Sequence, residues 1–293
     1  LSYTHRTFHG FFVTDDLGRN AATAYETYTL TAPNDPRLPN AGQPITYYAV
    51  KAAANVTGQS ILRPETFYGP ERDSHWNGVD FTLNARLRQG LTLQLGTSTG
   101  GAVVDTCQTV TALNNVLAAG TGLSGQTENG PDPRGCRNVD PWQTTVRGLA
   151  SYTIPKIDVL VSATVRSQPP IQLTANWQVP NSVILASLGH LPAGATATGT
   201  TTLQLLPTND TNKLYADQRR NQIDMRVAKV LRFGRTRTDV GFDLYNLLNS
   251  NYATAYNTTY VYNTDNAPRA AGWGTPTGIF QPRFVRFNVT VDF

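Results

Sequence analysis

The last stretch of the chain alternates apolar and polar residues without interruption. Its apolar positions are Val285, Phe287, Val289, Val291 and Phe293, with Arg286, Asn288, Thr290 and Asp292 between them. A period of two residues is typical of a β-strand with one apolar face and one polar face. Residues 283–293 also match the roughly 9–11 residues of a tilted strand that crosses a bilayer. We therefore predict that the chain ends in a membrane-spanning strand.

Seven earlier segments show the same alternation. The clearest is 79–88, which turns at Gln89-Gly90 and returns over 91–98, the pattern of a β-hairpin with a tight turn. The alternation is weakest in the first segment, where it decays at Phe8-His9-Gly10. The expected strands are residues 1–13, 79–88, 91–98, 142–153, 158–166, a strand beginning at 223–227, 239–245 and 283–293.

The connections between these strands alternate between tight turns and long loops. The long loops are residues 14–76, 107–140, 167–218 and 249–281, and we expect short strands such as 45–52 to project within the first. In an antiparallel up-and-down sheet, alternate connections lie at the same end. Compact domains seldom contain structureless connections longer than ~12–15 residues. The pattern therefore predicts an all-β, antiparallel up-and-down transmembrane β-barrel with about eight strands in this chain.

Charged residues follow the polar parity of the expected strands. An arginine that faces lipid at mid-bilayer costs about 2–4 kcal/mol, so keeping charges off one face favours a membrane-facing sheet. We expect most of the lumen-facing side chains to pair with one another across neighbouring strands and a minority to contact a solute. The lumen-facing candidates are Asp80, Asn84, Arg86, Arg166, Asp224, Arg226, Asp243 and Arg286.

Composition narrows the class of protein further. Only 15% of residues are charged, against roughly 25% in a typical soluble domain. No apolar run approaches the ~18 residues of a transmembrane helix. The net charge of +4 comes without a basic cluster, which argues against nucleic-acid binding.

The two cysteines, Cys107 and Cys136, flank a loop rich in glycine, asparagine and proline. We predict a disulfide between them, which would close a loop of about 30 residues and contribute roughly 3–4 kcal/mol in the chain-entropy model. Such a bond would place the loop in an oxidising compartment. The alternative is two unrelated thiols.

Candidate catalytic chemistry is sparse. The four histidines, His5, His9, His75 and His190, have no metal-ligand spacing, and the Gly-x-Ser-x-Gly, Cys-x-x-Cys and His-Glu-x-x-His motifs do not occur. We therefore expect no enzymatic activity, no resident metal and no cofactor.

Aromatic residues fall into two groups. The first lies near strand ends or on apolar parity and fits an interfacial girdle: Tyr152, Phe233, Phe242, Phe287 and Phe293. The second lies among asparagine and threonine in the last long loop, where it would bind a sugar-rich or peptide ligand or else pack within the loop itself. Its members are Tyr252, Tyr256, Tyr260, Tyr262 and Trp273.

Four segments resemble a known family. They are residues 77–87 (Asn-Gly-Val-Asp-Phe-Thr-Leu-Asn-Ala-Arg-Leu), 222–229, 233–238 and 243–249 (Asp-Leu-Tyr-Asn-Leu-Leu-Asn). These segments look like the C-terminal barrel of TonB-dependent outer-membrane receptors, in particular the Oar-like group of acidobacterial type. The resemblance extends from about residue 77 to residue 293.

The resemblance implies a fold and a function. Members carry a plug domain and a TonB box within a 22-stranded barrel, and import a scarce solute such as a siderophore, oligosaccharide or peptide. Neither plug nor TonB box is present here, so these residues would form the last third or so of the barrel. The chain begins at Leu1 and its sole methionine is Met225, so we expect a fragment or a processed product.

The resemblance also implies partners and a location. The location is the outer membrane of a Gram-negative bacterium, and the partners are outer-membrane lipid, and the plug and TonB in the complete protein. The barrel assembly machinery would bind the C-terminal strand through a signature formed by Phe287, Val289, Val291 and Phe293.

Two alternatives remain open at this point. One is a self-contained, eight-stranded outer-membrane barrel with a structural or adhesive role, in which residues 1–13 pair with residues 283–293. The other is a soluble secreted β-sheet binding domain, in which the apolar face of the last strand packs against another sheet.

Overall fold

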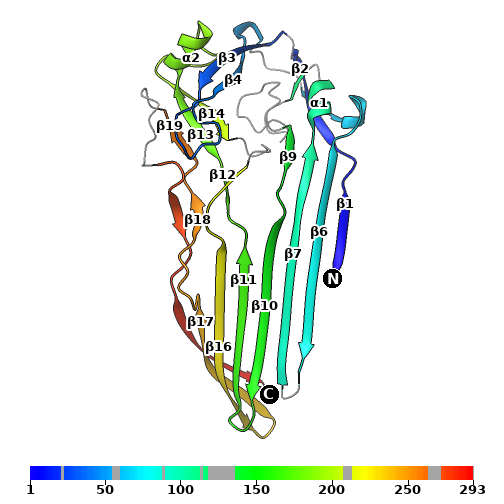
Figure 1. Ribbon diagram of the computed structural model, residues 1–293, viewed down its shortest axis with the longest axis vertical. Helices are drawn as coiled ribbons and strands as arrows, with labels where there is room; N and C mark the ends of the chain where they lie inside the picture. Colours follow the sequence, from blue (N-terminus) through cyan, green and yellow to red (C-terminus); the bar gives the residue numbers. More distant parts are fainter. Residues whose placement is uncertain are drawn as a thin grey trace.

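One long antiparallel sheet dominates the computed structural model (Figure 1). Its strands follow the order β1-β6-β7-β10-β11-β16-β17-β21, in which each strand pairs with its sequence neighbour in the sheet. Their bounds are β1 Ser2–Thr7, β6 Asp73–Arg86, β7 Leu91–Asp105, β10 Gln143–Ile154, β11 Val159–Gln168, β16 Arg220–Phe233, β17 Thr236–Tyr245 and β21 Phe284–Asp292. The structure describes residues 1–20, 23–54, 60–87, 90–112, 115–117, 136–206, 213–262 and 272–292.

The predicted strands and their antiparallel order are confirmed, with one correction. The strand expected over residues 1–13 ends at Thr7, and a separate strand, β2 (Phe12–Asn20), pairs in another sheet. Gly10 lies between them with a φ of 79°, a left-handed conformation that breaks an extended strand. The decay of alternation at Phe8-His9-Gly10 therefore marks a change of sheet.

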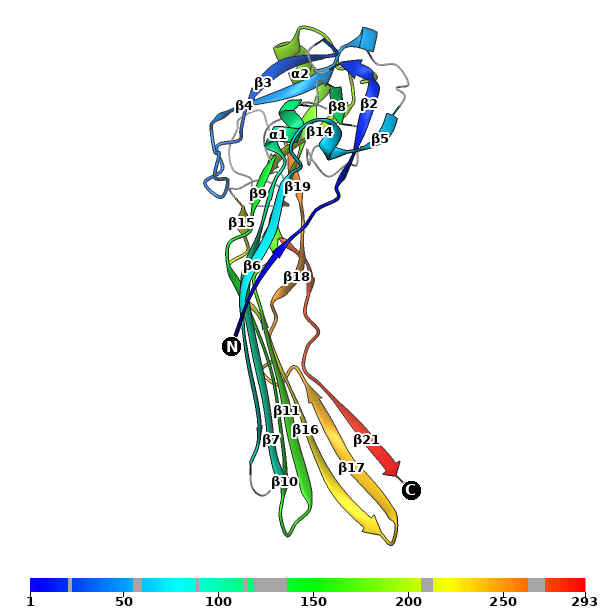
Figure 2. The same ribbon diagram turned by 90° about the vertical axis from the view of Figure 1, so that its right-hand side faces the viewer.

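The sheet is open and curved. Figure 2 shows β17 and β21 bending away from β7 and β10. Among the described residues, β1 and β21 lie at opposite edges and do not pair with each other. The tight turns lie at one end of the sheet and the long connections at the other (Figure 1).

Strand register gives the sheet one apolar face. Residues directly opposite each other in neighbouring strands share a face. One such row joins Tyr152, Val161, Val227, Phe242 and Phe287. Many of these side chains are open to solvent, and Phe287 is 83% exposed and Val289 64% exposed. From the tight turns up to the row of Tyr3 and Val79, this face carries two charged side chains among the described residues. They are Lys229 and, at the upper end, Arg219, whose Nε donates a hydrogen bond to Oγ of Ser167 over 3.2 Å.

The opposite face of the sheet is polar. All eight lumen-facing candidates fall on it, because the register places them in rows that alternate with the apolar rows. Arg147, Arg232 and Arg237 share this face. The strand pairing therefore places these arginines on the polar face, as the alternation of the sequence predicted.

The long connections contain strands and helices of their own. Residues 167–218, predicted as one long loop, contain four strands and a helix among the described residues, and the projecting strand expected near 45–52 is β4. Within the first connection lie β2, β3 (Tyr25–Thr31), β4 (Pro44–Val50), η1 (Ala52–Ala54), β5 (Ser60–Pro64) and η2 (Glu65–Phe67), and within the second α1 (Cys107–Ala112), β8 (Asn115–Leu117) and β9 (Arg137–Val139). The third and fourth contain β12 (Gln172–Leu173), β13 (Ala175–Pro180), α2 (Asn181–Leu188), β14 (Thr200–Leu206), β15 (Leu214–Tyr215), β18 (Ala253–Tyr256), β19 (Thr259–Val261) and β20 (Pro276–Ile279).

Three of the long connections share one hydrophobic core, which we call the head. Tyr47 of β4, Trp177 of β13, Ile184 of α2, Leu205 of β14 and Tyr260 of β19 are all buried in it. Strand β13 pairs with β14 and with β19, so the third and fourth connections are joined by backbone hydrogen bonds. The head lies beyond the end of the sheet that is opposite the tight turns (Figures 1 and 2).

The predicted disulfide is confirmed. Cys107, at the start of α1, is bonded to Cys136, whose backbone oxygen accepts a hydrogen bond from the N–H of Thr106. Strand β9 follows directly and pairs with the end of β7. Within the described residues, the helices are too short and too polar to cross a membrane.

Candidate functional site

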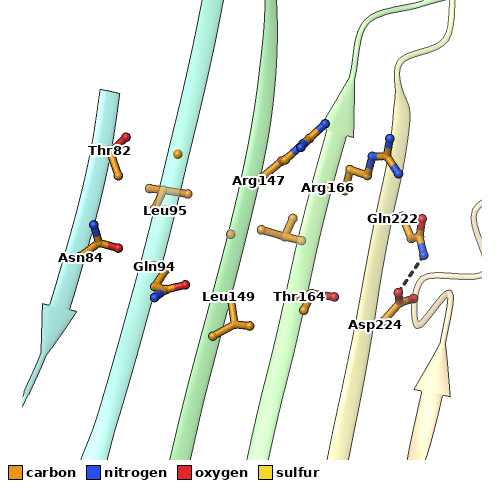
Figure 3. A pocket seen from close by; sticks show the side chains of 13 residues that line it. Thr82, Asn84, Gln94, Leu95, Arg147, Leu149, Thr164, Arg166, Gln222 and Asp224 are labelled. Carbon is orange, nitrogen blue, oxygen red and sulfur yellow. Dashed lines mark hydrogen bonds between the residues drawn. The ribbon is translucent and has the colours of Figure 1, made fainter. Parts of the chain in front are cut away.

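The polar face of the sheet carries the candidate site. A hollow of about 700 Å³ runs across β6, β7, β10, β11 and β16 (Figure 3). We call it the arginine groove. Its lining includes Asn84, Gln94, Arg147, Leu149, Thr164, Arg166, Gln222 and Asp224.

Strand register builds the arginine groove from two adjacent rows. The first row runs through Thr82, Gly96, Arg147, Arg166 and Gln222. A Cβ added to Gly96 would find its nearest neighbour 3.9 Å away, so the missing side chain leaves open space beside Arg147. The second row lies one step nearer the tight turns and runs through Asn84, Gln94, Leu149, Thr164 and Asp224.

Arg147 and Arg166 are directly opposite each other on β10 and β11. Both side chains are exposed. Arg147 reaches from β10 toward β11, and Arg166 from β11 toward β16 (Figure 3). Within the described ranges, neither guanidinium lies within ion-pair distance of a carboxylate. Like charges directly opposite in a sheet repel each other, so this pair is an electrostatic cost of the folded sheet.

Asp224 lines the same groove, but its carboxylate is already engaged. The Nε2 of Gln222 donates to its Oδ2 over 2.7 Å, and the backbone N–H of Asn246 donates to its Oδ1 over 2.8 Å. Asn246 is buried and has a φ of 52°, and its side chain bonds the backbone of Ser250 and Gln281. The Asp-Leu-Tyr-Asn-Leu-Leu-Asn segment therefore forms the turn that holds Asp224 in place.

A second, smaller hollow of about 240 Å³ lies toward β21. Here opposite charges pair across strands. The Nη2 of Arg286 lies 2.8 Å from Oδ2 of Asp243, and the Nε of Arg226 lies 3.8 Å from Oδ1 of the same carboxylate. Asn288 joins both, because it donates to Asp243 over 2.9 Å and accepts from Arg226 over 2.9 Å. The pairing expected between lumen-facing candidates is found in this cluster.

Four lumen-facing candidates remain: two lie outside both hollows, and two line the arginine groove. Asp80 is opposite Ser2 at the edge of the sheet, and Arg86 is opposite Thr92 near the tight turns. Asn84 and Arg166 line the arginine groove. The list of lumen-facing candidates left out Arg147, Gln94 and Gln222. Arg147 falls on the polar parity of its strand, and counting outward from the four-residue turn 155–158 places it opposite Arg166.

The aromatic ligand candidates of the last long loop differ in burial: two lie in the core of the head, and three are partly exposed. Tyr260 and Trp273 are each 4% exposed and belong to the core of the head, so for these two packing within the head replaces the expected ligand surface. Tyr262 stacks on Trp177 at 5.8 Å, and Tyr252 stacks on Phe280 at 4.6 Å. Tyr256 is half-buried in β18.

An ion pair between a buried carboxylate and an exposed arginine lies at the edge of this core. The guanidinium of Arg37 lies 2.6 Å from the buried carboxylate of Asp35 and 5.1 Å from the ring of Trp273. Tyr260 donates its hydroxyl to Asp35 over 3.1 Å. The hydrogen bond from Arg37 holds the pKa of Asp35 below its usual value, and burial together with the adjacent carboxylate raises the pKa of Tyr260 to about 12.

The described residues of the C-terminal signature and the histidines lie away from both hollows. Phe287, Val289 and Val291 of the C-terminal signature are exposed on the apolar face, and Phe293 lies outside the described residues. His5 and His75 lie with their ring centres 5.8 Å apart at the β1 edge, and His75 contacts Asp73. In the part of the chain that the structure describes, no group of three or more histidine, cysteine or acidic side chains is arranged to hold a metal ion.

No family model, curated protein or solved structure matches this chain.

Proposed function

We propose that this chain is the C-terminal part of the barrel of a TonB-dependent outer-membrane receptor, which in its complete form imports a scarce solute through a plugged lumen. One observation carries the proposal. From the tight turns up to the row of Tyr3 and Val79, the sheet exposes an apolar face that carries two charged side chains, Lys229 and Arg219, while the other charged side chains of these rows lie on the opposite face. A contiguous apolar surface of this extent needs an apolar environment to cover it, and lipid supplies one.

The height of the apolar face fits a membrane. On β16 it runs from Ile223 to Phe233, which is ten residue steps. At roughly 3.3 Å per step and a tilt of about 40°, this length spans about 25 Å, the height of the lipid-facing band of outer-membrane barrels. Phe233 is 64% exposed at the lower end of this band and supplies an aromatic side chain at the expected interface.

Lys229 is consistent with the same environment. It lies near the middle of the Ile223–Phe233 stretch, and its Nζ reaches toward one end of the sheet, where it donates a hydrogen bond to the backbone oxygen of Ile157 in the turn between β10 and β11. A lysine on a lipid-facing surface extends its ammonium toward the interface in this way while its methylene groups remain in the apolar layer.

The edges of the sheet support membership of a larger barrel. The outer side of β21 and the lower half of β6, residues 81–86, carry no described strand partner. Open strand edges do not persist in lipid, because unpaired backbone groups cost several kcal/mol each there. Further strands of a 22-stranded barrel would cover both edges, and the head would lie on the outer surface, at the end of the long loops.

A pair of neighbouring substitutions tests the membrane assignment. Leu83 lies on the apolar face of β6 and is 39% exposed, and Thr82 beside it lies on the polar face. In lipid vesicles, Leu83→Arg is expected to lower the free energy of unfolding by about 2–4 kcal/mol, whereas Thr82→Arg changes it by no more than about 0.5 kcal/mol. Urea titration followed by tryptophan fluorescence measures both values.

Equal effects of the two arginines would contradict the membrane assignment. So would a chain that stays monomeric in buffer without detergent and does not associate with vesicles, since that behaviour belongs to a secreted soluble domain.

A further inference from the structure

We infer that the arginine groove binds the oxyanion of a small solute, a carboxylate or a phosphate, between Arg147 and Arg166. The inference stands apart from the proposed function, because it needs only the folded sheet and no transport. Three features carry it: a pair of like charges with no carboxylate within ion-pair distance, a hollow of suitable size beside it, and polar side chains that line the hollow.

The charge pair is unusual within this sheet. Arg226 and Arg286 flank one strand, and the carboxylate of Asp243 between them lies within 4.0 Å of both guanidinium groups. Arg232 and Arg237 are also directly opposite, but Arg237 pairs with Asp239 at 3.1 Å. Among the described residues, Arg147 and Arg166 are the directly opposed arginines for which no carboxylate lies within 4.0 Å of either guanidinium.

Among the described contacts, Asp224 forms no ion pair with either arginine. It lies one row below Arg166, and both of its oxygens accept hydrogen bonds from neutral donors of Gln222 and Asn246. Counting Arg147, Arg166 and Asp224, the groove keeps one uncompensated positive charge. A bound monoanion or dianion would remove the repulsion between the two arginines.

The geometry suits an oxyanion in particular. Each guanidinium presents a planar fork of N–H donors that matches carboxylate and phosphate oxygens, and two forks on adjacent strands can hold one anion between them. Gln94, Asn84 and Thr164 add amide and hydroxyl groups, and Leu149 adds an apolar contact in the next row. A hollow of about 700 Å³ lies within the roughly 300–1,000 Å³ of small-molecule sites.

Calorimetric titration of the full chain, folded in detergent, tests this inference. The probes are inorganic phosphate and acetate, with chloride at equal ionic strength as the reference. We expect one site per chain for at least one probe. The double variant Arg147→Gln/Arg166→Gln is expected to weaken binding by about 10-fold to 100-fold, since it removes charge-assisted hydrogen bonds.

Two further variants separate a binding role from a structural one. Arg147→Lys keeps the charge but loses the fork, so its affinity is expected to fall between those of the wild type and the double variant. Arg86→Gln removes an arginine from the same face outside the groove and is expected to bind as the wild type does. The circular dichroism of every variant is compared with that of the wild type, and removal of like-charge repulsion is not expected to lower the melting temperature.

The two probes identify the source of the oxyanion. Tighter binding of phosphate assigns a phosphate ester, and tighter binding of acetate assigns a carboxylate. Binding of neither anion above the chloride reference would overturn the inference. Unchanged affinity in a folded double variant, or an equal loss in Arg86→Gln, would overturn it as well.

Discussion

At the scale of single residues, the upper part of the sheet depends on two glycines that leave room for a tryptophan. Gly78 and Gly100 are directly opposite on β6 and β7, and the ring of Trp76 lies over both. A Cβ on Gly100 would lie 2.5 Å from the backbone oxygen of Asn77 and 2.5 Å from the Trp76 ring. A clash with backbone cannot be relieved by rotating a side chain.

Replacement of Gly100 is therefore expected to destabilise the sheet. Gly100→Ala should lower the free energy of unfolding by about 1–3 kcal/mol, the usual cost of overpacking. Gly96→Ala, on the same strand and the same face, meets nothing closer than 3.9 Å, and is expected to leave stability unchanged or raise it by about 0.4–1 kcal/mol. Urea unfolding in detergent compares the two, and an equal loss in both variants would show that the glycines matter only for backbone freedom.

Several residue-level features could be predicted from the sequence and others could not. The parity of Arg86, Arg166 and Arg226 follows from strand alternation alone, and the register confirms it. The opposition of Arg147 and Arg166 could not be predicted, because the register depends on the length of the turn. The predicted strand ends at 153 and 158 would pair Arg147 with Thr164, whereas the turn is the four residues 155–158. The hydrogen bond from Tyr260 to Asp35 could not be predicted either, since 225 residues separate the two in sequence and their contact depends on the packing of two loops.

At the scale of elements, the eight strands of the large sheet could be predicted because their two faces meet different environments. The strands of the head were largely missed for the opposite reason. They are short, and β14 ends in four consecutive buried residues, Leu203 to Leu206, so the alternation is lost. Burial on both faces and runs of two to seven residues leave little periodicity to detect.

The link between the first and last long connections is expected to depend on pH. Tyr260 in the folded protein has a pKa of about 12, above the ordinary value of about 10. A raised pKa means that the unfolded chain loses this proton first. The stabilisation by Tyr260 is therefore fully present below pH ~10 and is lost as the pH rises from about 10 to about 12.

Tyr260→Phe tests this dependence. At neutral pH the variant is expected to lose about 1.5–3 kcal/mol, the contribution of a hydrogen bond to a charged group. The difference from the wild type should shrink above pH ~10 as the wild type loses the same stabilisation. Tyr256→Phe is the control, because in the described residues the hydroxyl of Tyr256 makes no hydrogen bond that the variant would remove. A difference that stays constant up to pH ~12 would contradict the pKa given for Tyr260.

At the scale of the whole molecule, a two-faced sheet continues into a folded head. The sequence predicted the sheet, its tight turns at one end and its disulfide, because each depends on local patterns or on the only two cysteines. It did not predict that three long connections share one core. In our proposal the sheet lies in the outer membrane, the polar face lines a lumen, and the head covers the outer opening.

The most direct test is the environment of successive residues along β21. Both native cysteines are in the disulfide, so a nitroxide label on a single introduced cysteine reports that position alone. For the chain in lipid vesicles, we expect collisions with oxygen to be frequent at 285, 287, 289 and 291, and collisions with a water-soluble nickel chelate to be frequent at 286, 288, 290 and 292. Higher oxygen accessibility at the odd positions than at the even ones would place the apolar face in lipid. The same accessibility at odd and even positions would contradict the proposal that this face contacts lipid.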